Sequence, residues 1–316
     1  MNSLPSSQSP RELIAGVPCD FLSHNELVTY ITSCLAADDA PHASTSLSIN
    51  PSPLHLVHIV TLNAEMVVTA QTNNVFKTAI EQAELVIPDG SGILWAREYA
   101  KHRHPRPDRG STSTRTWIPA FALQFGGRAG MTMSLLFFLF SKVKPLTGVD
   151  SIFTICEELE KQHGTAYLLG GEEGDRKKTA EMFRKKYPKL TIIALNDETP
   201  SSSPLVRGRE RRIPLLTKEG LGEVMKPAAI FVALGAPKQT LWIEEHRTQL
   251  EQSGVRIAIG VGGAFAMISG RLPRAPKLFQ QLHMEWAWRL MLEPARMKRI
   301  WNAVVVFPRL ISGYPH

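Results

Sequence analysis

A repeated pattern of apolar run, polar or glycine turn and amphipathic run constrains the fold of this chain more than any other feature. Its first copy begins with the β-branched run 56–62, and apolar positions at helical spacing follow it. A second short run, 85–87, ends at a Pro-Asp-Gly sequence, where proline and glycine stop a strand. Two strands joined by a helix form a parallel βαβ unit, so we expect Thr61, Asn63 and Asp89 at the same edge of a sheet.

This edge is where open α/β sheets bind their ligands. An Asp before Gly is also common in turns and at helix N-caps, so Asp89 alone would not indicate a site. Its placement together with Thr61 and Asn63 favours a functional role.

The same pattern recurs in the second half of the chain. Apolar runs at 165–169, 228–234 and 255–261 each feed a glycine turn, and such turns present backbone N–H groups to an anion. The turns lack the full G-x-G-x-x-G spacing, so each signal is weak alone. Together they predict an α/β fold with a doubly wound, mostly parallel, Rossmann-like sheet and a nucleotide at its edge. The glycines expected at the nucleotide are Gly170, Gly171, Gly235, Gly262 and Gly263.

The length of 316 residues suits one large α/β domain with appendages, or two small domains. Breaker-rich and charged segments separate the predicted parts. We expect a disordered tail at 1–14, the α/β domain at 15–270 with insertions at about 40–53, 101–143 and 196–214, and a basic helical appendage at 271–316.

The formal net charge of +7 indicates an anionic partner, which could be nucleotide phosphate, a lipid surface or nucleic acid. Cys19, Cys34 and Cys156 form neither a CxxC motif nor a metal-ligand spacing, so they read as separate buried thiols in a reducing compartment. The N-terminus lacks the basic and then apolar pattern of a secretory signal, and we expect a cytoplasmic protein.

Two segments allow more than one interpretation. The basic insertion 101–110 contains histidines and arginines that suit metal or phosphate, but a solvated loop is favoured because no second cluster completes a metal shell. The apolar run 131–140 is about half of the roughly 20 residues needed to span a bilayer. It suits a buried or partner-covered helix, an interfacial membrane segment or, through 135–140, a homo-oligomer contact.

The C-terminal segment mixes basic and aromatic residues, which suits a phosphate-rich or membrane-interface partner as well as a solvated basic face. Arg289, Arg296 and Arg299 are seven and three residues apart, so they would share a face of a continuous helix. Pro294 is expected to start a new helix, which weakens that geometry.

Eight motifs, in this order, resemble the WecG/TagA/CpsF family, glycosyltransferase family 26. The matching segments are TLNAE at 61–65, PDG at 88–90, TGVD at 147–150, LLGG at 168–171, GAPKQ at 235–239, GVGGAF at 260–265, RAPK at 274–277 and the segment Glu285–Pro294.

The resemblance implies an inverting, metal-independent and cofactor-free glycosyltransferase on the cytoplasmic membrane face, as a peripheral membrane protein. Its donor would be a UDP-sugar carrying an N-acetylhexosamine, above all N-acetylmannosamine or its uronic acid, and its acceptor a polyprenyl-diphosphate-linked sugar. It makes Asp89 the general base, places Thr61 and Asn63 beside the sugar pocket and matches Gln239 to a site glutamine. By the same resemblance Arg289, Arg296 and Arg299 close over the site and grip diphosphate, and 271–316 meets the membrane.

These roles make physical sense. Inversion needs one base in line with the anomeric carbon, and departure of UDP without a metal needs arginine and backbone donors. The sequence contains no D-x-D motif, which agrees with metal independence. It departs from the family at Ala266, where Asp is usual, at Thr240, where Glu is usual, and before Thr147, where a basic residue is expected.

Two other classes of protein fit parts of the sequence. An NAD-binding Rossmann protein would need the G-x-G-x-x-G turn, and a basic membrane- or nucleic-acid-binding module would not need Asp89 with Thr61 and Asn63. We therefore expect chemistry, without a nucleic-acid partner.

Overall fold

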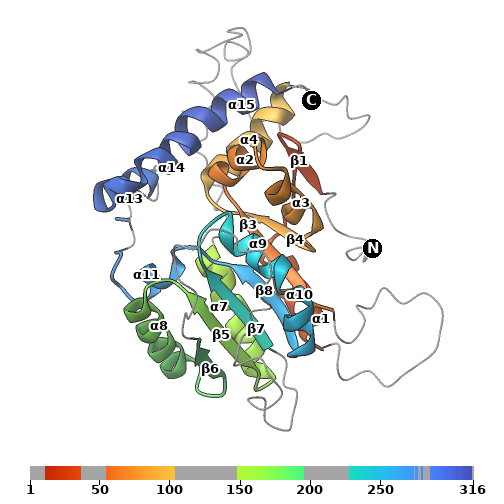
Figure 1. Ribbon diagram of the computed structural model, residues 1–316, viewed down its shortest axis with the longest axis vertical. Helices are drawn as coiled ribbons and strands as arrows, with labels where there is room; N and C mark the ends of the chain where they lie inside the picture. Colours follow the sequence, from red (N-terminus) through yellow and green to blue (C-terminus); the bar gives the residue numbers. More distant parts are fainter. Residues whose placement is uncertain are drawn as a thin grey trace, which may run out of the picture.

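The sheet of this protein has six strands in the order β4-β3-β8-β7-β5-β6, and every neighbouring pair is parallel (Figure 1). The computed structural model describes residues 11–36, 55–103, 148–195, 228–273, 275–276, 279 and 285–314. The strands are β3 (Val57–Leu62), β4 (Leu85–Pro88), β5 (Thr165–Gly170), β6 (Thr191–Ala194), β7 (Ala228–Ala233) and β8 (Val255–Gly260). The predicted insertions at 40–53 and 196–214 lie outside the described residues, as does 101–143 apart from residues 101–103. The apolar run 131–140 is therefore also outside them.

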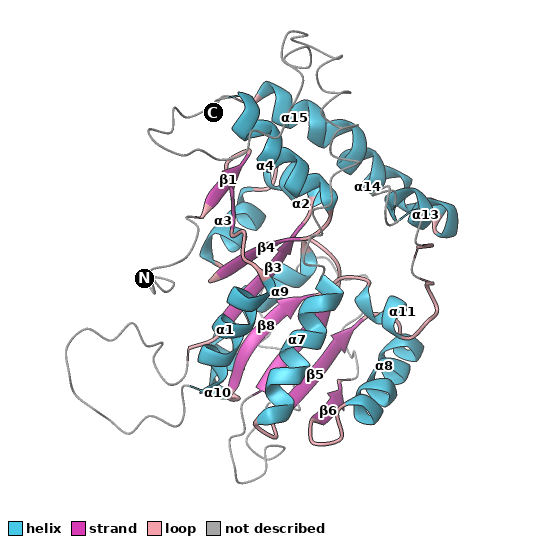
Figure 2. Cartoon of the chain, turned by 180° about the vertical axis from the view of Figure 1, so that it is seen from behind, coloured by secondary structure: helices cyan, strands magenta, loops and turns pink. Residues whose placement is uncertain are grey.

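Helices cover both faces of this sheet, as a doubly wound fold requires (Figures 1 and 2). Because both faces are buried, the strands are continuous apolar runs. One face packs against α1 (His24–Leu35), α7 (Gly148–Lys161), α8 (Glu173–Lys186) and α11 (Ala264–Ile268). The other packs against α2 (Ala64–Ala70), α3 (Asn74–Gln82), α4 (Ser91–Arg103), α9 (Lys238–Glu245) and α10 (Arg247–Gln252). The predicted fold class is confirmed.

The chain leaves β3 and β8 in opposite directions, although the two strands are neighbours. Helix α2, after β3, packs on one face through Met66 and Val67, whereas α11, after β8, packs on the other through Phe265 and Ile268. Ligands of open α/β sheets bind in the crevice at such a switch point. The fold therefore directs attention to the carboxyl ends of β3 and β8.

The segment after β3 is two helices and not the single amphipathic helix that the spacing predicts. Helix α2 ends at Ala70, and α3 begins after Asn73, whose side chain accepts a hydrogen bond from the N–H of Phe76 at 3.0 Å. The break shifts the helical phase, so Val75, one of the apolar positions of the predicted helix, is 71% exposed. A local N-cap thus outweighs the apolar spacing.

The starts of α1 and α7 are stabilised in different ways. Ser23 caps α1 in a full capping box with Glu26. Asp150 is the third residue of α7, where its charge favours the helix dipole.

The N-terminal part forms a small antiparallel hairpin of β1 (Glu12–Ile14) and β2 (Val17–Cys19). Strand β1 begins inside the range predicted as a tail, so that boundary was placed too late. Arg11 and Asp20 join in a two-bond ion pair of 2.8 Å, and Asp20 also accepts from the N–H of Val86 on β4. These bonds fasten the hairpin to the edge of the sheet.

The appendage is helical, as predicted, and its last turns are buried against α2 and α4 (Figure 1). Phe307 and Ile311 are each 1% exposed there. Within the described residues no helix is long and apolar enough to cross a membrane. The segments are α13 (Glu285–Leu292), the 3-10 turn η4 (Pro294–Arg296), α14 (Met297–Trp301), the π-helical η5 (Asn302–Val306) and α15 (Phe307–Gly313).

Candidate active site

Asp89 lies at the carboxyl edge of the sheet, directly after β4. Its N–H donates to the carbonyl of Leu62 at 2.7 Å, which fixes the turn beside the end of β3. Its Oδ1 accepts from the N–H of Gly148 at 3.2 Å, at the N-terminus of α7, where helix N–H groups stabilise a carboxylate. The side chain is half-buried and thus neither sealed in the core nor fully solvated.

Thr61 and Asn63 flank the end of β3, and each uses its side chain within the protein. The Thr61 hydroxyl is buried and donates to the carbonyl of Gly260 on β8 at 2.9 Å. The Asn63 side-chain oxygen accepts from the N–H of Met66 at 3.0 Å and caps α2. Both residues therefore shape the switch point.

Gln239 joins two of the glycine turns. Its buried Oε1 accepts from the N–H of Gly235 at 3.1 Å, after β7, and of Gly262 at 2.9 Å, after β8. A Cβ at Gly260 would lie 2.5 Å from Nε2 of Gln239, so the strand end must be glycine for the glutamine to fit. Gln239 therefore fixes the distance between the two glycine turns, after β7 and β8, that were predicted to bind a nucleotide.

Backbone conformation and packing account for the two glycines at the end of β5 without a ligand. Gly170 and Gly171 have φ of +79° and +71°, and a Cβ at Gly170 would lie 3.0 Å from the carbonyl of Ala233. A Cβ at Gly171 would lie 3.3 Å from the ring of Phe265 on α11. These two positions stay a prediction as nucleotide contacts.

Two of the three predicted arginines reach this edge from the appendage. Nη2 of Arg296 lies 3.3 Å from where a Cβ at Gly263 would stand, beside the turn after β8, and its Nε pairs with Glu293 at 2.7 Å. Arg299 pairs with Glu65 in the first turn of α2. Helix α13 ends at Leu292 and Pro294 begins η4, as expected, so Arg289 and the other two arginines do not lie on one continuous helix. The side chain of Arg289 lies outside the described residues.

The contacts form one continuous edge. Gly148 joins Asp89 to Thr61, because a Cβ at Gly148 would lie 3.5 Å from the Thr61 methyl. From there the contacts run through Gly260 to Gln239 and the turn after β8. The predicted residues near β3, β4, β7 and β8 therefore lie in one region, with backbone N–H groups, a carboxylate and two arginines at its rim. Glu65, Gly148 and Gly260, for which no site role was predicted, also belong to this region.

The thiols take no part in this region. Cys19, Cys34 and Cys156 are free and buried, as predicted. Burial raises the pKa of Cys34 to about 11 and raises that of the other two further, so all three stay protonated at neutral pH. Among the described residues no three His, Cys, Asp or Glu side chains are grouped to hold a metal ion.

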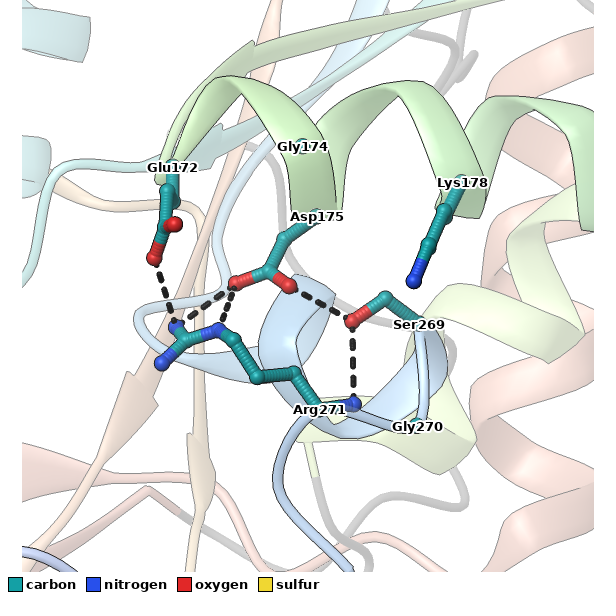
Figure 3. Close-up of a pocket in the computed structure, with 7 residues that line it drawn as sticks. All are labelled: Glu172, Gly174, Asp175, Lys178, Ser269, Gly270 and Arg271. Atoms are coloured by element: carbon teal, nitrogen blue, oxygen red, sulfur yellow. Dashed lines mark hydrogen bonds and ion pairs between the residues drawn. The ribbon is translucent and has the colours of Figure 1, made fainter.

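A pocket of about 270 Å³ lies elsewhere, between the start of α8 and the end of α11 (Figure 3). Asp175, whose side chain is 5% exposed, accepts from Ser269 at 2.7 Å and from Nε and Nη2 of Arg271 at 2.7 and 2.6 Å. Glu172 lies 3.4 Å from the same guanidinium. Because these groups satisfy one another, we interpret the cluster as a clasp on the segment that leads to the appendage.

Comparison with known proteins agrees with this arrangement. The family described as "Glycosyl transferase WecG/TagA/CpsF family" matches residues 13–124 and 128–314. The chain belongs to this family. The resemblance drawn from the motifs is thereby confirmed, and the protein is a glycosyltransferase.

Two curated relatives carry the same name, N-acetylglucosaminyldiphosphoundecaprenol N-acetyl-beta-D-mannosaminyltransferase. The protein of Staphylococcus aureus (strain MRSA252) is 26% identical over 248 residues, which cover 77% of this chain and 74% of the relative. That of Bacillus spizizenii (strain W23) is 23% identical over 255 residues, 81% of this chain and 77% of the relative. Both names describe transfer of a sugar to a lipid diphosphate that already carries a sugar.

Proposed function

We propose that this protein transfers an N-acetylhexosamine, N-acetylmannosamine or its uronic acid, from a UDP-sugar to a polyprenyl-diphosphate-linked sugar, with inversion and without a metal. The observation that carries the proposal is the half-buried carboxylate of Asp89 beside the switch point, held by a helix N-terminus. The names of the relatives support the acceptor class.

Each step of the reaction has a group at this edge. The Asp89 carboxylate would accept the proton of the acceptor hydroxyl as that oxygen attacks the anomeric carbon from the side opposite to UDP. The diphosphate leaves with both electrons of its bond to the sugar, and its charge would be met by Arg296, Arg299 and the N–H groups of the glycine turns. No step of this scheme needs a metal.

The test is release of UDP from a panel of UDP-sugars in the presence of a short-chain lipid-diphosphate sugar, with the wild type and Asp89→Asn. We expect a loss of at least about 10²-fold in kcat for the variant, the size of a general-base contribution. Unchanged turnover would remove Asp89 from this role. Stabilisation by UDP without transfer from any donor would favour a nucleotide-binding protein instead.

Asp20→Asn is a matched control. Asp20 is buried and holds Arg11 and the N–H of Val86, away from the carboxyl edge. This variant should lower the melting temperature and keep kcat below that temperature. A loss of kcat that follows stability in both variants would contradict a chemical role for Asp89.

The same proposal places the appendage on a lipid surface. It presents exposed apolar side chains together with the exposed Lys298, a mixture that binds the interface of anionic membranes. Trp301→Ala should weaken sedimentation with anionic vesicles, while Val75→Ala, at an exposed apolar site on α3, should not. Equal binding of both variants would overturn this surface as the contact. The exposed apolar residues are Met291, Leu292, Met297 and Trp301.

A further inference from the structure

We propose that Glu65 is a positioning residue that holds Arg299 by one nitrogen and leaves the rest of its guanidinium for a diphosphate. The inference rests on the proposed function and deepens it. Glu65 lies in the first turn of α2, two residues after Asn63, and its side chain is largely buried. Nothing in the reaction scheme itself uses this carboxylate.

The bond pattern of this pair differs from that of three other arginine–carboxylate pairs among the described residues. Nε of Arg299 donates to both oxygens of Glu65, at 2.8 and 2.9 Å. Arg97 uses Nε and Nη2 towards Glu12, as do Arg11 and Arg271 towards their aspartates. Among the contacts of the described residues, Arg299 therefore uses one of its five N–H donors, the one on Nε, within the protein. The four N–H donors on its two terminal nitrogens remain for a ligand.

The position of the pair suits an anion with two charged groups. Arg299 is held on the α2 side of the switch point, whereas Arg296, three residues earlier, lies over the turn after β8. A diphosphate in the crevice between β3 and β8 would lie between the two guanidinium groups. Arginine binds phosphate oxygens through paired N–H donors, which requires a fixed orientation of the fork.

The alternative is an ordinary surface ion pair. The side chain of Arg299 is 42% exposed, and such pairs add little to stability because water screens them. Docking of the appendage depends on Phe307 and Ile311, which are buried independently of this pair. Loss of the Glu65 carboxylate should therefore leave the fold and the docked helix in place and free the guanidinium to move.

The experiment measures equilibrium binding of UDP and of a short-chain polyprenyl diphosphate, so it does not depend on turnover. Glu65→Ala should weaken binding of at least one of them about tenfold, the effect of one charge-assisted hydrogen bond, while Glu65→Gln should lose less because its amide oxygen still accepts from Nε. Weaker binding of UDP assigns the pair to the donor, and weaker binding of the prenyl diphosphate assigns it to the acceptor. Unchanged binding of both overturns the proposal.

Two controls separate positioning from structure. Glu12→Ala breaks the Arg97 pair on the hairpin and should leave both affinities unchanged. In an Arg299→Ala background, Glu65→Ala should cost less than about twofold further, because a residue that acts through its partner has no effect without it. An equal loss in both backgrounds would overturn the proposal. Failure of the Asp89 test would leave these binding results interpretable, since they need no transfer.

Discussion

The appendage is attached to the α/β domain in two places, and the two attachments are made of different interactions. At its start, Arg271 and Ser269 are bound by the carboxylate of Asp175 in a clasp of charged hydrogen bonds (Figure 3). At its end, Phe307 and Ile311 are buried against α2 and α4. The rings of Phe307 and Trp95 pack edge to face, with 6.3 Å between their centroids. Ionic contacts are weakened by charge screening and by titration of their groups, whereas burial of apolar side chains carries no charge that salt can screen or pH can change.

The two ends of the appendage are therefore held to the domain by different physical effects. The end at α15 fixes the appendage to the domain by removing apolar surface from water. The start and the middle, where Arg296 and Arg299 lie, are held by ion pairs. Under the proposed function, a diphosphate would bind the terminal nitrogens of Arg299 while Glu65 keeps its Nε and the end of the appendage stays docked.

The largest effect is expected at the apolar attachment. Phe307→Ala should lower the free energy of unfolding by about 3–5 kcal/mol, because it opens a cavity in a cluster that is otherwise closed. Urea unfolding followed by circular dichroism measures this. Leu310→Ala, at a partly buried neighbour, should cost clearly less. Equal losses would contradict the view that burial of Phe307 holds this end.

A smaller effect is expected at the clasp. Asp175→Asn removes the charge that binds Arg271 and should cost about 1–3 kcal/mol, the range for hydrogen bonds to charged groups. Hydrogen exchange should rise at 269–273 and stay unchanged at 307–313. Lys178→Ala, at another residue that lines the pocket, should leave both segments unchanged. Faster exchange at 307–313 would show that the two attachments are not independent.

The sequence predicted the sheet well because strands buried on both faces must be apolar throughout. Strands β3, β4, β5, β7 and β8 lie within one or two residues of the predicted apolar runs, and their shared direction follows from the βα alternation. The break between α2 and α3 was missed because it depends on one Asn side chain that caps α3, a local choice with no period. Strand β1 of the hairpin was missed because it is short and the hairpin gains stability from Asp20 and Val86, far apart in the chain.

The residues at the edge of the site could be predicted from the sequence, but the hydrogen bonds that connect them could not. Strand ends in a βαβ unit must meet, so Thr61, Asn63 and Asp89 could be placed together from the sequence. The bond from Thr61 to Gly260 joins residues 199 positions apart, and no spacing rule predicts such a partner. Glu65 gave no signal because a glutamate in the first turn of a helix is favourable without any function.

The smallest effect is a pH dependence confined to the clasp. Burial opposes the charge of Asp175, but the hydrogen bonds from Arg271 and Ser269 outweigh it and hold the pKa of this carboxyl below the ordinary 3.8. A lowered pKa stabilises the folded state above the unfolded value and loses this contribution as pH falls through the folded value. Glu172 and Lys178 also face the clasp.

The wild type and Asp175→Asn should therefore differ by a constant amount in unfolding free energy from pH 8 to about pH 5, and the difference should shrink below about pH 4. Taking the difference between the two proteins cancels the titration of carboxylates that both contain. The corresponding difference for Phe307→Ala should not change with pH, because no titratable group is lost. A gap that stays constant down to pH 2.5 would show that the Asp175 charge contributes nothing and that only its shape matters at the clasp.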